Sequence, residues 1–228
     1  MSRRYLAFAL AATALTGCTP AATPSAAEPV PTRTATAAPP VPPTPPESAL
    51  LPAGEFGDGW QADGDSEVAT TGWLTNLEDL RDCPPMSAYP TVAARRQNFI
   101  RPRDAATVEV QTTAPGQGSA ALGVLREAVV DCATRPVTEP TAAPGTYQTS
   151  WSVPRTGFAG DESILIVGTA VELRGAPPSA YGPPRAWAFV AVVRRGDTLA
   201  IVSVTYKSEG YAVSLAQRAV ARLSAGQG

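Results

Sequence analysis

The N-terminus of the chain has the pattern of an export signal, and this decides which residues are left to fold. Arg3 and Arg4 are followed by an apolar run from Tyr5 to Leu15. This run is much shorter than the roughly 20 apolar residues that a membrane-spanning helix needs. A positively charged start, a short apolar stretch and small residues before the cleavage point are typical of a secretory signal peptide. Residues 1–17 are therefore predicted to be removed, and the rest of the chain is predicted to fold outside the cytosol.

The segment Leu15-Thr16-Gly17-Cys18 ends this apolar run and resembles the lipobox of bacterial lipoproteins. In a lipobox the cysteine thiol takes a diacylglyceryl group as a thioether, and the modified cysteine becomes the new N-terminus. The resemblance implies a lipid on Cys18 and a location on the extracellular face of the cell membrane. The alternative is a stray cysteine in an ordinary signal peptide. Ser2-Arg3-Arg4 also matches part of a twin-arginine signal, so both export routes stay open.

Residues 18–49 have the composition of a tether. They are rich in Pro, Ala and Thr and carry few charges, so they cannot bury enough apolar surface to offset the entropy of ordering. A proline-rich spacer is semi-rigid and extends by about 3.1 Å per residue, which gives a reach of at most ~90 Å. With a lipid on Cys18 this segment is a disordered tether, and without the lipid it is a plain disordered tail.

Residues 50–225 are predicted to form one domain, which is long enough for a single hydrophobic core. The whole chain has 20 acidic and 18 basic residues and a formal net charge of -2. This balance provides no electrostatic basis for binding nucleic acid.

Two cysteines remain once Cys18 is assigned to the lipid. Cys83 and Cys132 lie in a domain predicted to be outside the cytosol, where a pair of cysteines most simply forms a disulfide. A redox-active pair is disfavoured because the chain has no Cys-x-x-Cys spacing. A metal site is disfavoured because the chain has no histidine, and two thiolates do not complete a tetrahedral zinc shell.

The absence of histidine also removes several classes of enzyme. Ser-His-Asp and Cys-His catalysis need an imidazole of near-neutral pKa, and the sequence contains neither a G-x-S-x-G elbow nor a Walker A motif. Asp161-Glu162 is the candidate carboxylate pair for glycoside chemistry. Adjacent residues on a strand point to opposite faces, so we expect this pair to serve a turn and not catalysis. No cofactor and no enzyme activity are predicted.

Apolar side chains recur at helical spacing in three stretches, which predict helices. The stretches are Leu74, Leu77 and Leu80; Leu122, Leu125, Val129 and Cys132; and Val213, Ala216, Val220 and Leu223. The first must end before Pro84-Pro85, and the second has Ser119 as its predicted N-cap. The segment from Met86 to Pro102 is ambiguous, and residues 91–98 could form one more short helix.

Strands dominate the second half of the chain. Val108 and Val110 alternate with polar Glu109 and Gln111, which predicts a half-buried strand. Four further strands are predicted at 147–153, 164–173, 187–193 and 199–206, and Arg195-Gly196-Asp197 predicts a tight turn between the last two. Helices before and after a group of strands indicate an α+β fold. We expect an antiparallel β-sheet meander packed by helices on one face, with one disulfide.

These features together resemble the actinobacterial lipoproteins that share the extracellular sensor domain of PknH-type serine/threonine kinases. The matching features are Gly59-Trp60, Cys83-Pro84, the helix ending at Cys132, Gly160-Asp161-Glu162, residues 192–197 and the closing helix. The resemblance covers roughly residues 50 to 225 and implies a mixed domain with an antiparallel sheet, a disulfide and a ligand cleft. Kinase members usually carry two disulfides, whereas Cys83 and Cys132 can form only one. Without a kinase domain, any signal is expected to pass through a partner or not to be passed at all.

Aromatic and cationic residues in the strand region are the candidates for such a cleft. They are Tyr147, Trp151, Trp187, Arg185 and Tyr206. Aromatic residues more often belong to a core than to a binding site, so the core is the competing interpretation for each of them. The leading functional hypothesis is a binding module for an unidentified small ligand or cell-envelope component. The alternatives are a non-catalytic protein–protein interaction or structural lipoprotein and, ranked last, a carboxylate-based envelope hydrolase.

Overall fold

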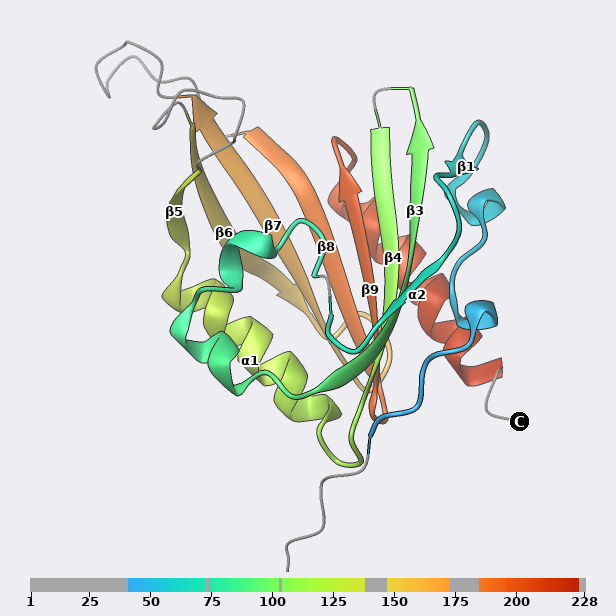
Figure 1. Ribbon diagram of the computed structural model, residues 1–228. Coiled ribbons are helices and arrows are strands. Elements are labelled where there is room, and N and C mark those ends of the chain that lie inside the picture. The colour runs from blue at the N-terminus through green and yellow to red at the C-terminus, as the bar shows by residue number, and fades with distance from the viewer. Residues whose placement is uncertain (1–40, 73, 103, 138–146, 173–184, 226–228) are drawn as a thin grey trace, which may run out of the picture. The chain divides into compact units, whose positions relative to one another are not determined.

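The computed structural model describes residues 41–72, 74–102, 104–137, 147–172 and 185–225 (Figure 1). The predicted signal peptide, Cys18 and the greater part of the predicted tether lie outside these ranges. Among the described residues, no helix is both long enough and apolar enough to span a membrane.

The described strands form one nine-stranded antiparallel sheet. Its main path runs β1-β3-β4-β9-β8-β7-β6-β5, and β2 also pairs with β3. The five strands from β5 to β9 are a meander, and the β3–β4 hairpin joins it because β4 pairs with β9. The bounds are β1 Gln61–Ala62, β2 Glu67–Ala69, β3 Val92–Arg101, β4 Asp104–Thr113, β5 Thr134–Val137, β6 Tyr147–Thr156, β7 Glu162–Glu172, β8 Arg185–Arg195 and β9 Thr198–Thr205.

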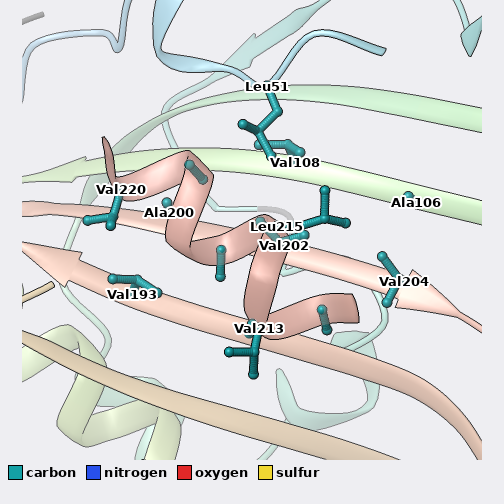
Figure 2. Packing of buried hydrophobic residues seen from close by; sticks show 14 of the residues in the cluster. Leu51, Ala106, Val108, Val193, Ala200, Val202, Val204, Val213, Leu215 and Val220 are labelled. Atoms are coloured by element: carbon teal, nitrogen blue, oxygen red, sulfur yellow. The ribbon is translucent and has the colours of Figure 1, made fainter. Parts of the chain in front are cut away.

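Two α-helices pack on this sheet, from opposite sides. Apolar residues of α1 (Gly118–Asp131) share a buried cluster with Ile164, Ile166 and their neighbours, whereas those of α2 (Glu209–Ala225) share one with Leu165 and Val167. Figure 2 shows the α2 side, where Val213, Leu215 and Val220 lie among Val193, Ala200 and Val202. Alternate residues of one strand point to opposite faces, so the central strands are apolar on both.

The α+β class, the antiparallel sheet packed by helices and the disulfide are confirmed. The prediction that helices cover one face alone is wrong. Nearly continuous apolar runs such as the one in β7 need cover on both sides. We call the two sides of the sheet the α1 face and the α2 face.

One predicted helix and one segment left open as a possible helix are not α-helical in the described chain. Leu74, Leu77 and Leu80 are all buried, but only Glu78–Leu80 is helical, as the short 3₁₀ helix η3. Leu74 and Asn76 have φ values of 52° and 65°, which an α-helix cannot accommodate. Residues 91–98 lie mostly in β3, which pairs along its whole length with β4. Pairing with a neighbouring strand overrides the helix propensity of its Ala, Arg and Gln residues.

The folded domain begins earlier than the predicted boundary at residue 50. Pro42, Pro45 and Ala49 are buried, Glu47–Ala49 forms the 3₁₀ helix η1, and a second one, η2, spans Ala53–Phe56. The Pro45 carbonyl accepts a hydrogen bond from Arg95 Nε at 2.8 Å. The prediction of disorder up to residue 49 is therefore wrong for residues 41–49. Composition alone did not reveal that β3 supplies a partner for this segment.

Two cations and a carboxylate close the end of the β3–β4 hairpin. Asp104 Oδ2 accepts hydrogen bonds from Arg101 at 2.6 Å and lies 2.7 Å from the Lys207 ammonium nitrogen. The Arg101 guanidinium and the Lys207 ammonium also lie 5.4 and 5.9 Å from the centre of the Trp60 ring. The hydrogen bonds from Lys207 and then Arg101 hold the pKa of Asp104 below its ordinary value of 3.8.

This lowered pKa predicts a pH dependence of stability. A carboxylate with a depressed folded-state pKa stabilises the fold above its unfolded-state pKa and loses that contribution as the pH falls through the folded-state value. We expect the difference in unfolding free energy between the parent and Asp104→Asn to be constant between about pH 5 and 7 and to shrink below about pH 4. Urea denaturation across this range measures it. A difference of the same size at pH 3 and pH 7 would contradict the assignment.

Candidate functional site

The disulfide joins the segment that precedes η4 to the C-terminal end of helix α1. Cys132 is the C-cap of α1, and Cys83 immediately precedes the 3₁₀ helix η4 (Pro84–Ala88). The two cysteines are bonded, with their Cα atoms 6.2 Å apart and a sequence separation of 49. Both are buried in the apolar cluster on the α1 face. The predicted pairing of Cys83 with Cys132 is confirmed.

Two of the predicted site residues come together as a tryptophan pair on the same face. Trp151 lies on β6 and is 3% exposed, and Trp187 lies near the start of β8. Their rings meet edge to face with centroids 5.7 Å apart. Gly168 is opposite Trp151 in the sheet, and a Cβ at this position would be 2.6 Å from the Trp151 ring. The absence of a side chain on Gly168 therefore makes room for Trp151 to lie flat against the sheet.

The indole N–H groups of the tryptophan pair are both buried, and neither has a hydrogen-bond partner among the described residues. An indole nitrogen is a donor only. A buried donor without an acceptor costs roughly 1–3 kcal/mol. The pair is therefore a place where an acceptor atom of a ligand would gain hydrogen bonds that the described chain does not make.

The other predicted site residues are not shown to contact the tryptophan rings. Tyr206 follows β9, is 71% exposed and has a φ of 55°, and its backbone nitrogen donates to the Trp187 carbonyl at 2.9 Å. Tyr147 and Arg185 begin β6 and β8, and their side chains lie outside the described part of the structure. Of the predicted site residues, Trp151 and Trp187 are thus in contact through their rings, and Tyr206 is hydrogen-bonded to Trp187 through the backbone.

A row of polar residues lies on the same α1 face of the sheet as the tryptophan pair. Asn98, Thr107 and Ser203 stand opposite one another on β3, β4 and β9. The Thr107 hydroxyl donates to Asn98 Oδ1 at 3.0 Å, and the Asn76 amide donates to Ser203 Oγ at 2.5 Å. These groups are uncharged and can both donate and accept hydrogen bonds.

A buried hydrogen-bond network lies along β4, on the side of the strand that its polar residues predict to face solvent. Glu109 and Gln111 are 1% and 0% exposed, so the prediction that β4 is half-buried is wrong. The Glu109 carboxylate accepts hydrogen bonds from the Leu74 backbone N–H at 3.0 Å and the Gln111 amide at 2.6 Å. The Tyr89 hydroxyl donates to Gln111 Oε1 at 2.6 Å. Burial, assisted by the Glu109 charge, raises the pKa of the Tyr89 hydroxyl well above its ordinary value.

The segment from Leu74 to Leu80, which we call the covering segment, hides this network. It is held by the Leu74 N–H on Glu109 and the Asn76 amide on Ser203. Leu74 and Asn76 both adopt left-handed backbone conformations, which cost of order 1–3 kcal/mol each in non-glycine residues. The sequence did indicate that this segment is buried, because the leucine-rich stretch from Leu74 to Leu80 precedes a cysteine. A buried glutamate, however, cannot be told from a solvated one by alternation alone.

The carboxylate pair at Asp161 and Glu162 converges, against expectation. Asp161 lies in the turn before β7, so the rule for adjacent strand residues does not apply to it. Arg194 binds Asp161 at 3.4 Å and Glu162 at 3.1 Å, and Asp161 also accepts from the Gly196 backbone at 2.7 Å. The two acids thereby brace the predicted turn between β8 and β9, which is confirmed at Gly196 and Asp197. Their shared partner is an arginine of the same chain.

Comparison with known proteins identifies the fold. No protein-family model matches the chain, and no curated protein matches it by sequence. The structure is similar to the crystal structure of the extracellular domain of PknH from Mycobacterium tuberculosis, with a TM-score of 0.52 and 13% sequence identity. The similarity covers 78% of this chain and 94% of that domain. The described domain therefore has the fold of the PknH extracellular domain.

Proposed function

We propose that this chain is a non-catalytic extracellular binding lipoprotein, anchored in the membrane through Cys18, which captures a small ligand or cell-envelope component at the tryptophan pair. The observation that carries the proposal is the adjacent position of two buried indole N–H groups without acceptors in the described chain, at Trp151 and Trp187. The shared fold with the extracellular domain of PknH supports a role outside the cell.

The ligand class follows from the polar groups that the pair and the polar row present on the α1 face. Indole N–H groups donate, and the polar row of Asn98, Thr107 and Ser203 is neutral. A neutral ligand with acceptor oxygens and an apolar face matches these groups, whereas a strongly charged ligand would lose its hydration without a counter-charge. Because both indole nitrogens are buried, the ligand would reach them when the chain above them opens locally.

Val41, the first described residue of the predicted tether, lies at the end of the sheet opposite to the tryptophan pair. Val41 lies beside Pro90 and Thr91 and beside Ala114 and Pro115, at the β3 start and β4 end of the hairpin. The row containing Trp151 aligns through β7 and β8 with Thr205, at the opposite end of the sheet. Because β3 and β4 are ten residues long, these ends are about 30 Å apart. Val41 and the tryptophan pair thus lie toward opposite ends of the sheet, and we propose that the pair faces away from the anchored end of the chain.

Native mass spectrometry of the full chain, purified in detergent from the envelope of its host, tests ligand capture. We expect a non-covalent adduct on the parent that is lost in Trp187→Phe, which removes one indole N–H and retains an aromatic ring. Trp60→Phe is the matched control, because Trp60 is also buried but belongs to the cluster on the α2 face. Adduct-free parent in repeated preparations, or loss of the adduct in both variants, would refute capture at the pair.

The anchor is tested separately by Cys18→Ser. A lipobox requires the cysteine thiol, so we expect this variant to remain as uncleaved precursor or to leave the membrane fraction. Fractionation followed by immunoblotting and intact-mass measurement of the parent provides the readout. A parent whose N-terminus carries no acyl group would refute the anchor and leave the ligand proposal standing.

A further inference from the structure

A pocket that the proposed function does not use lies on the other side of the sheet. It has a volume of about 380 Å³, is open to solvent and is lined by the N-terminal segment, β1, β3 and the last turn of α2. This volume is within the roughly 300–1,000 Å³ that is typical of small-molecule sites. Leu50, Leu51, Pro52, Ala62 and Phe99 form its apolar lining. Phe99 and Leu51 belong to the α2-face cluster, so the sheet separates this pocket from the tryptophan pair.

Gln97 is a buried polar side chain in this apolar lining. It is 9% exposed, and its side-chain nitrogen donates to the carbonyls of Gly64 and Asn98, both at 3.0 Å. Both of its donors are thus used, whereas its side-chain oxygen accepts no hydrogen bond from the described residues. The pocket therefore offers an acceptor that suits an N–H or O–H group of a ligand.

Arg222 provides a positive charge at the same pocket. Its Nε donates to the Ser48 carbonyl at 3.3 Å, which fixes the side chain over the N-terminal segment. Its two terminal nitrogens make no ion pair or hydrogen bond with the described residues. A guanidinium with two free parallel donors fits a carboxylate. Glu47 also lines the pocket, and its carboxylate should weaken the attraction of Arg222 for an anion without cancelling a direct bidentate contact.

We propose that this pocket binds an amphipathic carboxylate that also carries a hydrogen-bond donor, which is the chemistry of a peptide C-terminus with an apolar last residue. The carboxylate lies on Arg222, the amide N–H donates to the Gln97 side-chain oxygen, and the apolar side chain packs on Leu51 and Phe99. Charge, hydrogen bonding and apolar surface each select one part of the same ligand. The site is independent of the tryptophan pair and stands whether or not that pair binds a ligand.

Isothermal titration of the full chain in detergent with N-acetyl-leucyl-leucine tests the proposal, with the C-terminal amide of the same dipeptide as the uncharged comparison. We expect the acid to bind and the amide to bind at least about tenfold more weakly, because a charge-assisted bidentate contact is lost. Arg222→Gln should remove this preference for the acid, whereas Glu47→Gln should increase the affinity for the acid. Arg195→Gln, an exposed arginine at the end of β8, is the control for a change in net charge.

A blocking variant keeps the test independent of charge. Ala62 is exposed on the edge strand β1 and lines the pocket, so Ala62→Phe should fill the pocket without disturbing the core and should abolish binding of both dipeptides. Three results would overturn the proposal. They are no binding of the acid up to about 10 mM, equal binding of acid and amide, and undiminished binding of the acid to Arg222→Gln or Ala62→Phe.

Discussion

Cys132→Ser is expected to lower the free energy of unfolding by about 4 kcal/mol. The disulfide with Cys83 closes a loop with a sequence separation of 49 residues, and the chain-entropy model assigns this stabilisation to a loop of that length. For a domain of this size the loss corresponds to a decrease of roughly 8–16 °C in melting temperature. Differential scanning calorimetry under oxidising conditions measures it.

Reduction separates loss of the bond from the effect of a serine hydroxyl in an apolar cluster. Dithiothreitol should lower the melting temperature of the parent and leave that of Cys132→Ser unchanged, because the variant has no bond to reduce. Any additional deficit of the variant relative to the reduced parent reports the cost of burying the hydroxyl. If the oxidised parent and the variant melt together, the two thiols are not bonded in solution.

Glu109→Ala is expected to cost about 2–6 kcal/mol and to release the covering segment. The substitution removes the acceptor of two buried donors, the Leu74 N–H and the Gln111 amide. Each buried donor left without a partner costs roughly 1–3 kcal/mol. Left-handed Leu74 and Asn76 should then relax, so amide hydrogen exchange between Leu74 and Leu80 should accelerate more than exchange in the central strands.

Glu67→Ala is the matched control for this prediction. The Glu67 carboxylate also binds a neighbour on the sheet, Arg96 at 2.5 Å, but it is half exposed. An exposed ion pair contributes about 0–1 kcal/mol, so this variant should remain close to the parent. Equal effects of the two substitutions, or unchanged hydrogen exchange in Glu109→Ala, would show that the buried network does not hold the covering segment.

The candidate site illustrates where alternation is informative and where it is not. The pattern of β4 correctly places Val108 and Val110 on one face with Glu109 and Gln111 on the other. It cannot show that a second layer covers the polar face, because this cover comes from residues far away along the chain. Trp151 and Trp187 were singled out for their aromatic character, but their contact depends on strand register and on Gly168 opposite Trp151. The cover from Leu74 to Leu80 has helical spacing of leucines, yet its burial is achieved without an α-helix.

The sequence by itself determined α1 and α2, whose apolar residues recur at helical spacing, and the strands β6 to β9, whose residues alternate or form apolar runs. It also indicated the pairing of Cys83 with Cys132. A regular period determines which face of an element must be buried, whatever buries it. Only the tertiary structure decided that α1 and α2 lie on opposite faces, that residues 92–101 are a strand, and that Glu109 is hidden from water. The helix faces and the cover over Glu109 depend on partners distant in sequence, and β3 depends on its pairing with β4. The free energy of such contacts outweighs the local preferences of the residues that make them.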